Sequence, residues 1–290
     1  MRSWVGARRE QFGPILRTLA MVAALALLTA SVAWSGPTAS PQPARAVGKP
    51  LAIPSVLAPK KVVAQTKRSI VVTLPAALLE QPSFDRARFS GKPIESVKTS
   101  HDEVAITFDD GPSPETPKFL KLLADNDAHA TFFLVGFRAW HFPESVYRIV
   151  EQGNEVGNHT WNHVKLKNLA PLELSTQIDR TQNMLARETG EAPFFIRPRG
   201  GKYDGLSVAA AKSRGLVVVL WSAQADDVGN TLAPEDLAYN ALLNVHPGSI
   251  ILMHETNSNT LKALPIVLAK LKRRGLKPVT LSHLLSDAQK

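Results

Sequence analysis

Two neighbouring carboxylates, Asp109 and Asp110, follow an apolar, β-branched stretch and stand immediately before a Gly-Pro turn. Adjacent carboxylates repel each other, and such crowding is tolerated when a cation neutralises one of them. The alternative is a turn in which an Asp only caps the next helix. The pair therefore indicates a cation site when other ligands accompany it.

A second pair of candidate ligands is His159 and His163, four residues apart in the sequence His-Thr-Trp-Asn-His. On a helical turn, side chains at this spacing share one face, so both imidazoles could bind one ion. Because the chain has no cysteine, a metal must be bound by histidines and carboxylates. Two imidazoles and one carboxylate, with one position open for water, are typical of catalytic zinc sites.

Three further polar groups follow apolar segments. Arg197 begins the sequence Arg-Pro-Arg-Gly-Gly, Asp227 follows the segment that contains Trp221, and His254 ends the apolar segment 250–253. Taken alone, a histidine at the tip of a buried strand is more often structural than catalytic. The Asp pair, the His pair and these three residues indicate one functional site only if the fold brings them together.

The elements that must position these residues alternate between short apolar runs and longer amphipathic segments. We expect strands at 104–108, 130–135, 155–157, 194–196, 217–220, 249–253 and 278–280. We expect helices at 114–126, 139–152, 171–189, 205–213, 234–243, 261–274 and 281–288. This alternation predicts parallel strands with helical crossovers, either an open sheet or a closed barrel. In both architectures functional residues gather at the carboxyl ends of the strands, where the groups named above fall.

The chain's positive charge lies in its first 100 residues. The 290-residue chain has a formal net charge of +9, made up of +3 in residues 1–33, +7 in 34–100 and −1 in 101–290. A nearly neutral main domain argues against a nucleic-acid partner. Residues 1–33 combine a basic start, an apolar stretch and a small-x-small end, which predicts a signal peptide, with an uncleaved membrane anchor as the alternative. We therefore expect an exported protein, periplasmic or secreted.

Between the leader and the main domain we expect two further segments. Residues 34–67, rich in Pro, Ala and Lys, predict an extended linker whose charge could attract membrane or cell wall. Residues 68–100 form an N-terminal extension, in which 69–74 has the composition of a strand. The functional domain is expected at 101–290.

Taken in order, four motifs resemble those of the polysaccharide deacetylases of carbohydrate esterase family 4, the NodB homology domain. They are Thr-Phe-Asp-Asp-Gly-Pro at 107–112, His-Thr-Trp-Asn-His at 159–163, Arg-Pro-Arg-Gly-Gly at 197–201 and Leu-Met-His at 252–254. The resemblance covers roughly residues 103–285. It implies a distorted seven-stranded (β/α) barrel and metal-dependent hydrolytic removal of N-acetyl, or else O-acetyl, groups from a polysaccharide.

Roles for individual residues follow from the resemblance alone. It implies that the metal, most simply Zn²⁺ with Co²⁺ or another divalent ion as alternatives, is bound by Asp110, His159 and His163. It implies a general base, a general acid, two residues that orient them and three that bind substrate: Asp109, His254, Arg197, Asp227, Gly200, Leu252 and Trp221.

The sequence departs from the family pattern near the substrate. Arg199 stands where a second Pro is usual, Gly200 where an aromatic residue is common, Gln224 where an Asp often occurs, and Val228 where a Trp often closes the acetyl pocket. These changes predict a wider groove with added positive charge. They leave the substrate open among peptidoglycan, chitin oligomers and an exopolysaccharide.

Two rival functions stay open. The first is a catalytically inactive carbohydrate-binding or assembly protein on the same barrel, against which the joint presence of base, acid and ligands speaks. The second is a metal-dependent phosphoester hydrolase. Such enzymes often use two metals in one site, whereas a single ligand set is visible at the strand ends.

Overall fold

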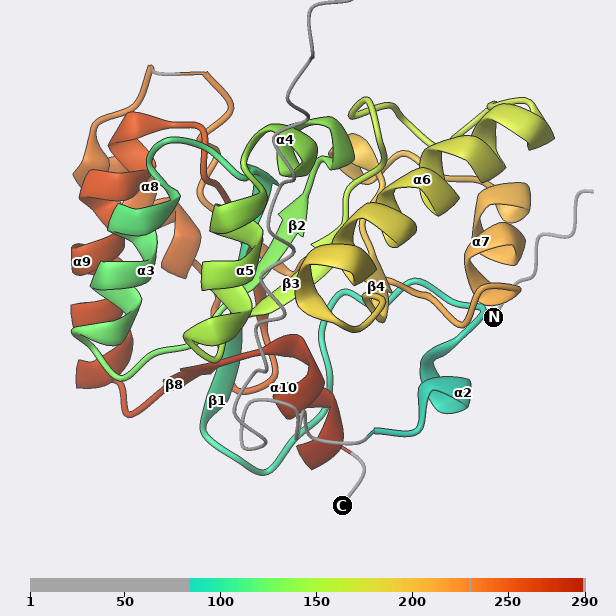
Figure 1. Cartoon of the computed structure of the whole chain (residues 1–290). Coiled ribbons are helices and arrows are strands. Elements are labelled where there is room, and N and C mark those ends of the chain that lie inside the picture. Colours follow the sequence, from blue (N-terminus) through green and yellow to red (C-terminus); the bar gives the residue numbers. More distant parts are fainter. Residues whose placement is uncertain (1–83, 230, 289–290) are drawn as a thin grey trace, which may run out of the picture. The chain divides into compact units, whose positions relative to one another are not determined.

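The computed structural model describes residues 84–229 and 231–288, which form a curled parallel sheet surrounded by helices (Figure 1). The neighbour order of the strands is β5-β4-β3-β2-β1-β7-β6, and β8 pairs with the start of β1. The strands are β1 Glu103–Gly111, β2 Thr131–Leu134, β3 Glu155–Asn158, β4 Phe195–Ile196, β5 Val217–Val218, β6 Ala223–Gln224, β7 Ile250–His254 and β8 Lys277–Val279.

One extended segment closes the sheet into a barrel. The Val219 amide donates to the carbonyl of Ile196, the last residue of β4, while the Ser222 amide, three residues on, donates to the carbonyl of Ile250 in β7. Residues 217–225 therefore pair with β4 over their first half and with β7 over their second half. The predicted distorted (β/α) barrel is confirmed, and β6 is a strand that sequence analysis missed.

The helices occupy the crossovers between strands and cover the outside of the barrel (Figure 1). They are α3 Thr116–Ala124, α4 Gly136–His141, α5 Pro143–Glu151, α6 Pro171–Thr189, α7 Gly205–Lys212, α8 Pro234–Leu242, α9 Ser258–Arg273 and α10 Leu281–Asp287. The expected single helix at 139–152 was wrong. The chain forms α4 and α5 there, because Pro143 disfavours helical backbone at Phe142 and opens a new helix.

Side chains on each strand point alternately into the barrel and outward toward the helices. They therefore form one core inside the barrel and another between the sheet and the helices. Phe132 of β2 faces the helices and lies 5.1 Å from the ring of Phe108, which in turn contacts Phe119 of α3 at 5.0 Å. The next residue, Phe133, belongs to the other cluster, with Ala105, Phe195 and Val219. Because side chains on a strand alternate with a period of two, β2 contributes to both cores.

Residues 84–100 pack against the barrel. They include the short helix α2 Arg86–Phe89. Phe84 stacks on Phe195 with centroids 5.5 Å apart, Ile94 forms a parallel bridge with Val219, and the Val97 amide donates to Gly248. The predicted leader at 1–33, the linker at 34–67 and the strand at 69–74 lie outside the described residues. Within the described ranges no helix is both long and apolar enough to cross a membrane.

Candidate active site

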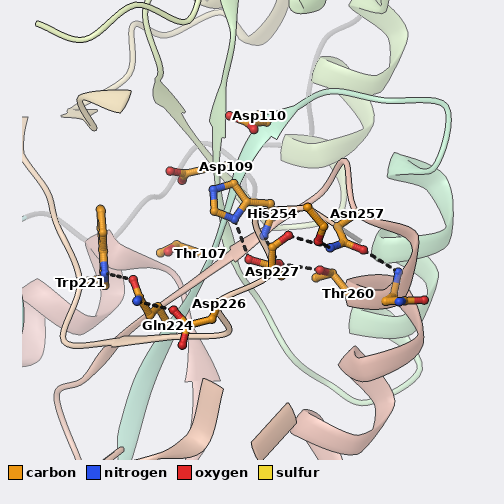
Figure 2. Close-up of polar contacts among 12 residues, drawn as sticks. Thr107, Asp109, Asp110, Trp221, Gln224, Asp226, Asp227, His254, Asn257 and Thr260 are labelled. Carbon is orange, nitrogen blue, oxygen red and sulfur yellow. Dashed lines mark hydrogen bonds and ion pairs between the residues drawn. The ribbon is translucent and has the colours of Figure 1, made fainter. Parts of the chain in front are cut away.

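The predicted base and acid come from two adjacent strands. Asp109 lies near the end of β1 and is the register partner of His254, the last residue of β7. The Glu255 amide donates to the Asp109 carbonyl at 3.0 Å, which continues the ladder past both side chains. Figure 2 shows the His254 ring between Asp109 on one side and Asp227 on the other.

Arg197 is completely buried and donates four hydrogen bonds. Its Nη1 donates to Asp109 Oδ1 at 2.7 Å and to Thr107 Oγ1 at 2.8 Å. Its Nε and Nη2 donate to the carbonyls of Val219 and Leu220 at 3.3 and 2.9 Å. These two residues lie where the closing segment changes from β4 to β7. The guanidinium thus fixes the Asp109 carboxylate and also satisfies carbonyls at the junction that closes the barrel.

The three predicted metal ligands converge beside Asp109. His163 Nε2 lies 2.9 Å and His159 Nε2 3.4 Å from Asp110 Oδ1, and one ligand atom from each of the three residues lies within 4.8 Å of the others. His159 Nδ1 lies 2.7 Å from the Arg197 carbonyl. Since a carbonyl only accepts, Nδ1 carries the proton and Nε2 presents its lone pair to the site.

The Asp110 carboxylate fits a cation. Its Oδ1 is buried and faces the Nε2 atoms of His159 and His163. Burial raises the pKa of Asp110, but the facing imidazoles of His159 and His163 outweigh it and hold that pKa well below its usual range. An ionised carboxylate beside two imidazole nitrogens is the donor set of a catalytic zinc site, so the residues present fit the metal that the family implies.

The backbone around the histidines differs from the prediction. His159 and His163 lie in a loop after β3 and not on a helical turn, with positive φ of 67° at Thr160 and 55° at His163. The loop is held from outside, because the amides of Gly136 and Phe137 donate to the carbonyls of Thr160 and Trp161. The two rings still lie 4.9 Å apart. The HxxxH spacing thus identified the pair correctly for the wrong geometric reason.

Asp227 holds His254 through several contacts. Its Oδ1 lies 2.7 Å from His254 Nδ1, and its Oδ2 accepts from the His254 amide at 2.7 Å and from Thr260 Oγ1 at 2.5 Å (Figure 2). Asn257 Nδ2 donates to the Asp227 carbonyl at 2.6 Å. Burial lowers the pKa of His254, yet the bond to Asp227 and the carboxylates of Asp109 and Asp110 raise it to about 9. Thr260 and Asn257 were not anticipated, because polar residues of that kind are common at helix starts.

The proposed base, the proposed acid and the three predicted metal ligands line one open pocket of about 750 Å³. The predicted substrate-binding residues Gly200, Trp221 and Leu252 all line it, so every predicted site residue except the buried Arg197 reaches this cavity. Trp221 Nε1 donates to Gln224 Oε1 at 2.8 Å, and Gln224 in turn donates to Asp226 at 2.5 Å (Figure 2). Val228 lines the pocket and is 80% exposed, which leaves that side of the pocket open.

One side of the pocket is positively charged. Lys165, Arg199 and Lys202 line it, and within the described residues none of the three forms an ion pair. The amides of Leu166 and Lys167 donate to the Lys202 carbonyl at 3.1 Å, so the loops that carry Lys165 and Lys202 are tied together. Sequence analysis anticipated Arg199 but missed the two lysines, although Lys165 stands only two residues after His163.

Comparisons with known proteins agree with this geometry. The family described as "Polysaccharide deacetylase" matches residues 96–219. The chain is 38% identical over 192 residues to a peptidoglycan-N-acetylglucosamine deacetylase of Bacillus cereus, covering 64% of this chain and 70% of that protein. It is 32% identical to the peptidoglycan-N-acetylmuramic acid deacetylase PdaC of Bacillus subtilis, covering 66% of this chain but 40% of that protein.

Two solved structures are informative neighbours. A peptidoglycan N-acetylglucosamine deacetylase in complex with a hydroxamate-type benzamide superposes with a TM-score of 0.63 at 36% identity, covering 66% of this chain and 91% of that chain. A pseudoenzyme of the CE4 family from Bacillus anthracis superposes with a TM-score of 0.65 at 29% identity, covering 70% and 72%. The fold is therefore compatible with both active and inactive proteins, and the side chains of the site must decide between them.

Proposed function

This chain belongs to the polysaccharide deacetylases of carbohydrate esterase family 4, and from that premise we propose that it is an exported zinc enzyme that removes N-acetyl groups from peptidoglycan. That it is a deacetylase, a hydrolase acting on an acetylated polysaccharide, follows from the family. The metal, the residue roles, the glycan and the location are the proposal. The observation that carries it is the convergence of Asp109, Asp110, His159, His163 and His254 on one pocket.

Asp110, His159 and His163 would hold the zinc ion. When bound, such an ion polarises the acetyl carbonyl and makes water a better nucleophile at neutral pH. The buried Oδ1 of Asp110, which faces two imidazole nitrogens, and the fixed tautomer of His159 support this assignment. The fixed tautomer of His159 presents a nitrogen lone pair, and nitrogen ligands suit zinc better than Mg²⁺, which prefers oxygen ligands.

Asp109 is the proposed general base. Its Oδ1 is engaged by Arg197 at 2.7 Å, and its Oδ2 lies 3.6 Å from His159 Nε2, on the side of the ligands. That oxygen takes a proton from the attacking water as the water oxygen bonds to the acetyl carbon. Arg197 holds the carboxylate in place and balances its charge, so that the proton moves over a short, fixed path.

His254 is the proposed general acid. Asp227 occupies Nδ1, which leaves the Nε2 proton free to be donated into the pocket. That proton passes to the sugar nitrogen as the carbon–nitrogen bond breaks, giving acetate and a free amine. We assign the Gly200 amide to the oxyanion, and Leu252 and Trp221 to contacts with the acetyl group and sugar. That all three residues line the same cavity supports these assignments.

Peptidoglycan is the proposed substrate on two grounds. The curated relatives named above act on it, and the pocket has a cationic side made by Lys165, Arg199 and Lys202. Peptidoglycan carries carboxylates on the peptides attached to its muramic acid units, whereas chitin oligomers are neutral. Cations that form no ion pair in the described part of the chain, and that lie beside the metal ligands, favour the charged polymer through long-range attraction.

The proposed location follows from the substrate and from the N-terminal sequence. A wall glycan is reached only outside the cytoplasm, and residues 1–33 have the pattern of a secretory leader. Fractionation of cells that express the full chain should find the protein in the periplasm, the envelope or the medium. Recovery in the cytoplasm with an intact leader would contradict this part of the proposal.

The inactive alternative is weakened by the side chains. A pseudoenzyme shares the fold, but this chain retains base, acid, both orienting partners and all three ligands in mutual contact. The test is acetate release by the full-length zinc-loaded protein from purified peptidoglycan and from N-acetylglucosamine oligomers. We expect a higher kcat/KM per acetyl group on peptidoglycan. Equal or better turnover of the neutral oligomers would overturn the substrate assignment while leaving the deacetylase intact.

A further inference from the structure

Glu255 is a buried carboxylate that packs against the turn carrying Asp109 and Asp110. It directly follows the last residue of β7, is 1% exposed and does not line the active-site pocket. Its Oε1 accepts from the Ser113 amide at 3.0 Å, from Ser113 Oγ at 2.9 Å and from Thr116 Oγ1. Glu255 takes no part in the proposed chemistry, yet these contacts all fall on the segment that follows Asp110.

Asp110 has a strained backbone conformation. Its φ is 72°, in the left-handed region that a residue with a side chain seldom occupies. Such a conformation persists only where the surrounding structure holds it in place. The Asp110 Oδ1 atom then lies 3.4 Å from His159 Nε2 and 2.9 Å from His163 Nε2. The contacts that fix the backbone on either side of Asp110 therefore set the position of a proposed metal ligand.

Glu255 fixes the chain on both sides of Asp110. Before Asp110, the Glu255 amide donates to the Asp109 carbonyl at 3.0 Å. After Asp110, the Glu255 carboxylate accepts from the amide and the hydroxyl of Ser113. One residue thus attaches the turn to the end of β7 through its backbone and through its side chain.

Gly111 shows how closely the carboxylate fits against the turn. A Cβ atom added at Gly111 would lie 1.9 Å from Glu255 Oε2, so only glycine leaves room for the carboxylate at this position. The Gly111 carbonyl accepts from the Val135 amide at 2.8 Å, which also holds this residue in place. The glycine that follows the Asp pair is therefore required by the packing of Glu255.

We propose that Glu255 is a positioning residue for the metal site, which holds Asp110 in its strained conformation so that the carboxylate faces both imidazoles before an ion binds. This inference rests on the proposed role of Asp110 as a metal ligand. Residues that orient metal ligands typically contribute about 10–100-fold to metal affinity or activity. Because Glu255 directly follows His254, the same residue also keeps the proposed acid in register with the metal ligand.

Glu155 offers a matched comparison. It is also buried, and its carboxylate likewise accepts from a serine amide, the hydroxyl of the same serine and a threonine hydroxyl, which belong to Ser282 and Thr131. Glu155 lies at the start of β3, at the end of the barrel away from the pocket, and does not line the pocket. Replacing Glu155 removes an equivalent set of hydrogen bonds without changing the turn at Asp110.

The experiment compares Glu255→Gln, Glu255→Met and Glu155→Met in the full-length protein. Glutamine keeps an acceptor for the Ser113 amide, whereas methionine keeps the length of the side chain and removes the oxygen acceptors. The zinc Kd is measured by competition with a chelator of known affinity, well below the Tm of each variant, and kcat and KM are measured with zinc bound.

We expect Glu255→Met to raise the zinc Kd at least about 10-fold and to lower kcat with little change in KM, because no residue of the pocket is altered. Glu255→Gln should restore both the zinc Kd and kcat to near the wild-type values. Glu155→Met should lower the Tm but leave the zinc Kd and kcat of the folded protein unchanged, which separates positioning from a merely structural role.

A second variant serves if Glu255→Met does not fold. Ser113→Ala combined with Thr116→Val keeps the carboxylate but removes both hydroxyl donors, and should raise the zinc Kd by a smaller factor. An unchanged zinc Kd in Glu255→Met or, where that variant does not fold, in this double variant would overturn the proposal, as would an equal rise in Glu155→Met. A wild type that binds no zinc would overturn the proposed function itself, and this inference with it.

Discussion

Asp109 and His254 occupy paired positions on the adjacent parallel strands β1 and β7, so the proposed base and acid stand side by side at the same edge of the barrel. Each is oriented by a side-chain contact with a residue of another segment, Asp109 with Arg197 and His254 with Asp227. Proton removal and proton delivery are thus assigned to neighbouring strands, and their separation is set by the ladder. The mechanism depends on these two supports as much as on the two groups themselves.

Arg197→Gln should destabilise the protein as well as inactivate it. The change leaves the Asp109 carboxylate buried without its counter-ion and removes donors from the carbonyls of Val219 and Leu220. Breaking a buried ion pair on one side costs about 3–5 kcal/mol, which denaturant unfolding would measure. Arg214→Gln, which breaks a more exposed pair with Asp179, is the control and should cost at most about 1 kcal/mol. Equal losses in the two variants would contradict the role given to Arg197.

Asp227→Asn should shift the alkaline limb of the pH profile. The carboxylate helps to raise the pKa of His254 to about 9, and a general acid works only below its pKa. Without Asp227 the limb of kcat/KM should move down toward the ordinary histidine pKa of about 6.5, so that activity at pH 8 falls more than activity at pH 6. Thr260→Val, which removes one hydrogen bond to Asp227 but keeps its charge, is the control and should move the limb much less. An unmoved limb in Asp227→Asn would show that Asp227 does not tune His254.

Lys165→Ala combined with Lys202→Ala should weaken binding of the charged polymer selectively. Exposed ion pairs contribute about 0.2–1 kcal/mol each, so KM for peptidoglycan should rise several-fold at low salt while KM for N-acetylglucosamine oligomers stays nearly constant. The difference should shrink as salt is added. Lys118→Ala, at a cation that does not line the pocket, serves as control. A parallel loss on both substrates would indicate that the lysines contact the sugar and not its carboxylates.

Glu255→Gln should remove a pH dependence of stability. Glu255 follows His254, and its Oε1 accepts from the amide and hydroxyl of Ser113 and from Thr116 beyond the Asp109–Asp110 turn. Burial raises the pKa of Glu255 to about 7 despite these hydrogen bonds. Because the folded pKa lies above the unfolded value, the associated stability is complete below about pH 4.5 and is lost as the pH rises to 7, in total roughly 3 kcal/mol.

The free energy of unfolding of the wild type should therefore decline between pH 4.5 and 7 relative to that of the Gln variant, which keeps the shape but does not titrate. Denaturant unfolding of both proteins across this range is the measurement. Two curves that run parallel would mean that Glu255 is ionised throughout and that its contacts with Ser113 and Thr116 outweigh its burial.

The sequence predicted the strand ends well because chemistry-bearing residues follow strong apolar runs there. It could not predict β6, since Ala223 and Gln224 carry no strand pattern and their pairing depends on closure of the barrel. It also placed His159 and His163 on a helix, because spacing alone does not reveal positive φ at Thr160.

Contacts between segments that are far apart in the chain could not be predicted from the sequence. Thr107 and the carbonyls of Val219 and Leu220 meet Arg197 only in three dimensions. His283 meets Glu103 only because β8 returns the chain to the start of β1. Such groups are separated by most of the domain, and local patterns carry no information about them.

The most direct test of the account is acetate release from peptidoglycan by zinc-loaded wild type, by chelated wild type, and by Asp109→Asn and His254→Ala loaded in the same way. We expect release by the wild type that stops on chelation and returns with zinc. We expect losses of at least about 100-fold in each variant, since general acid–base groups typically contribute about 10²–10⁴-fold, with the metal content of the variants unchanged. Full activity in Asp109→Asn, or release that survives chelation with the pocket emptied of metal, would contradict the mechanism.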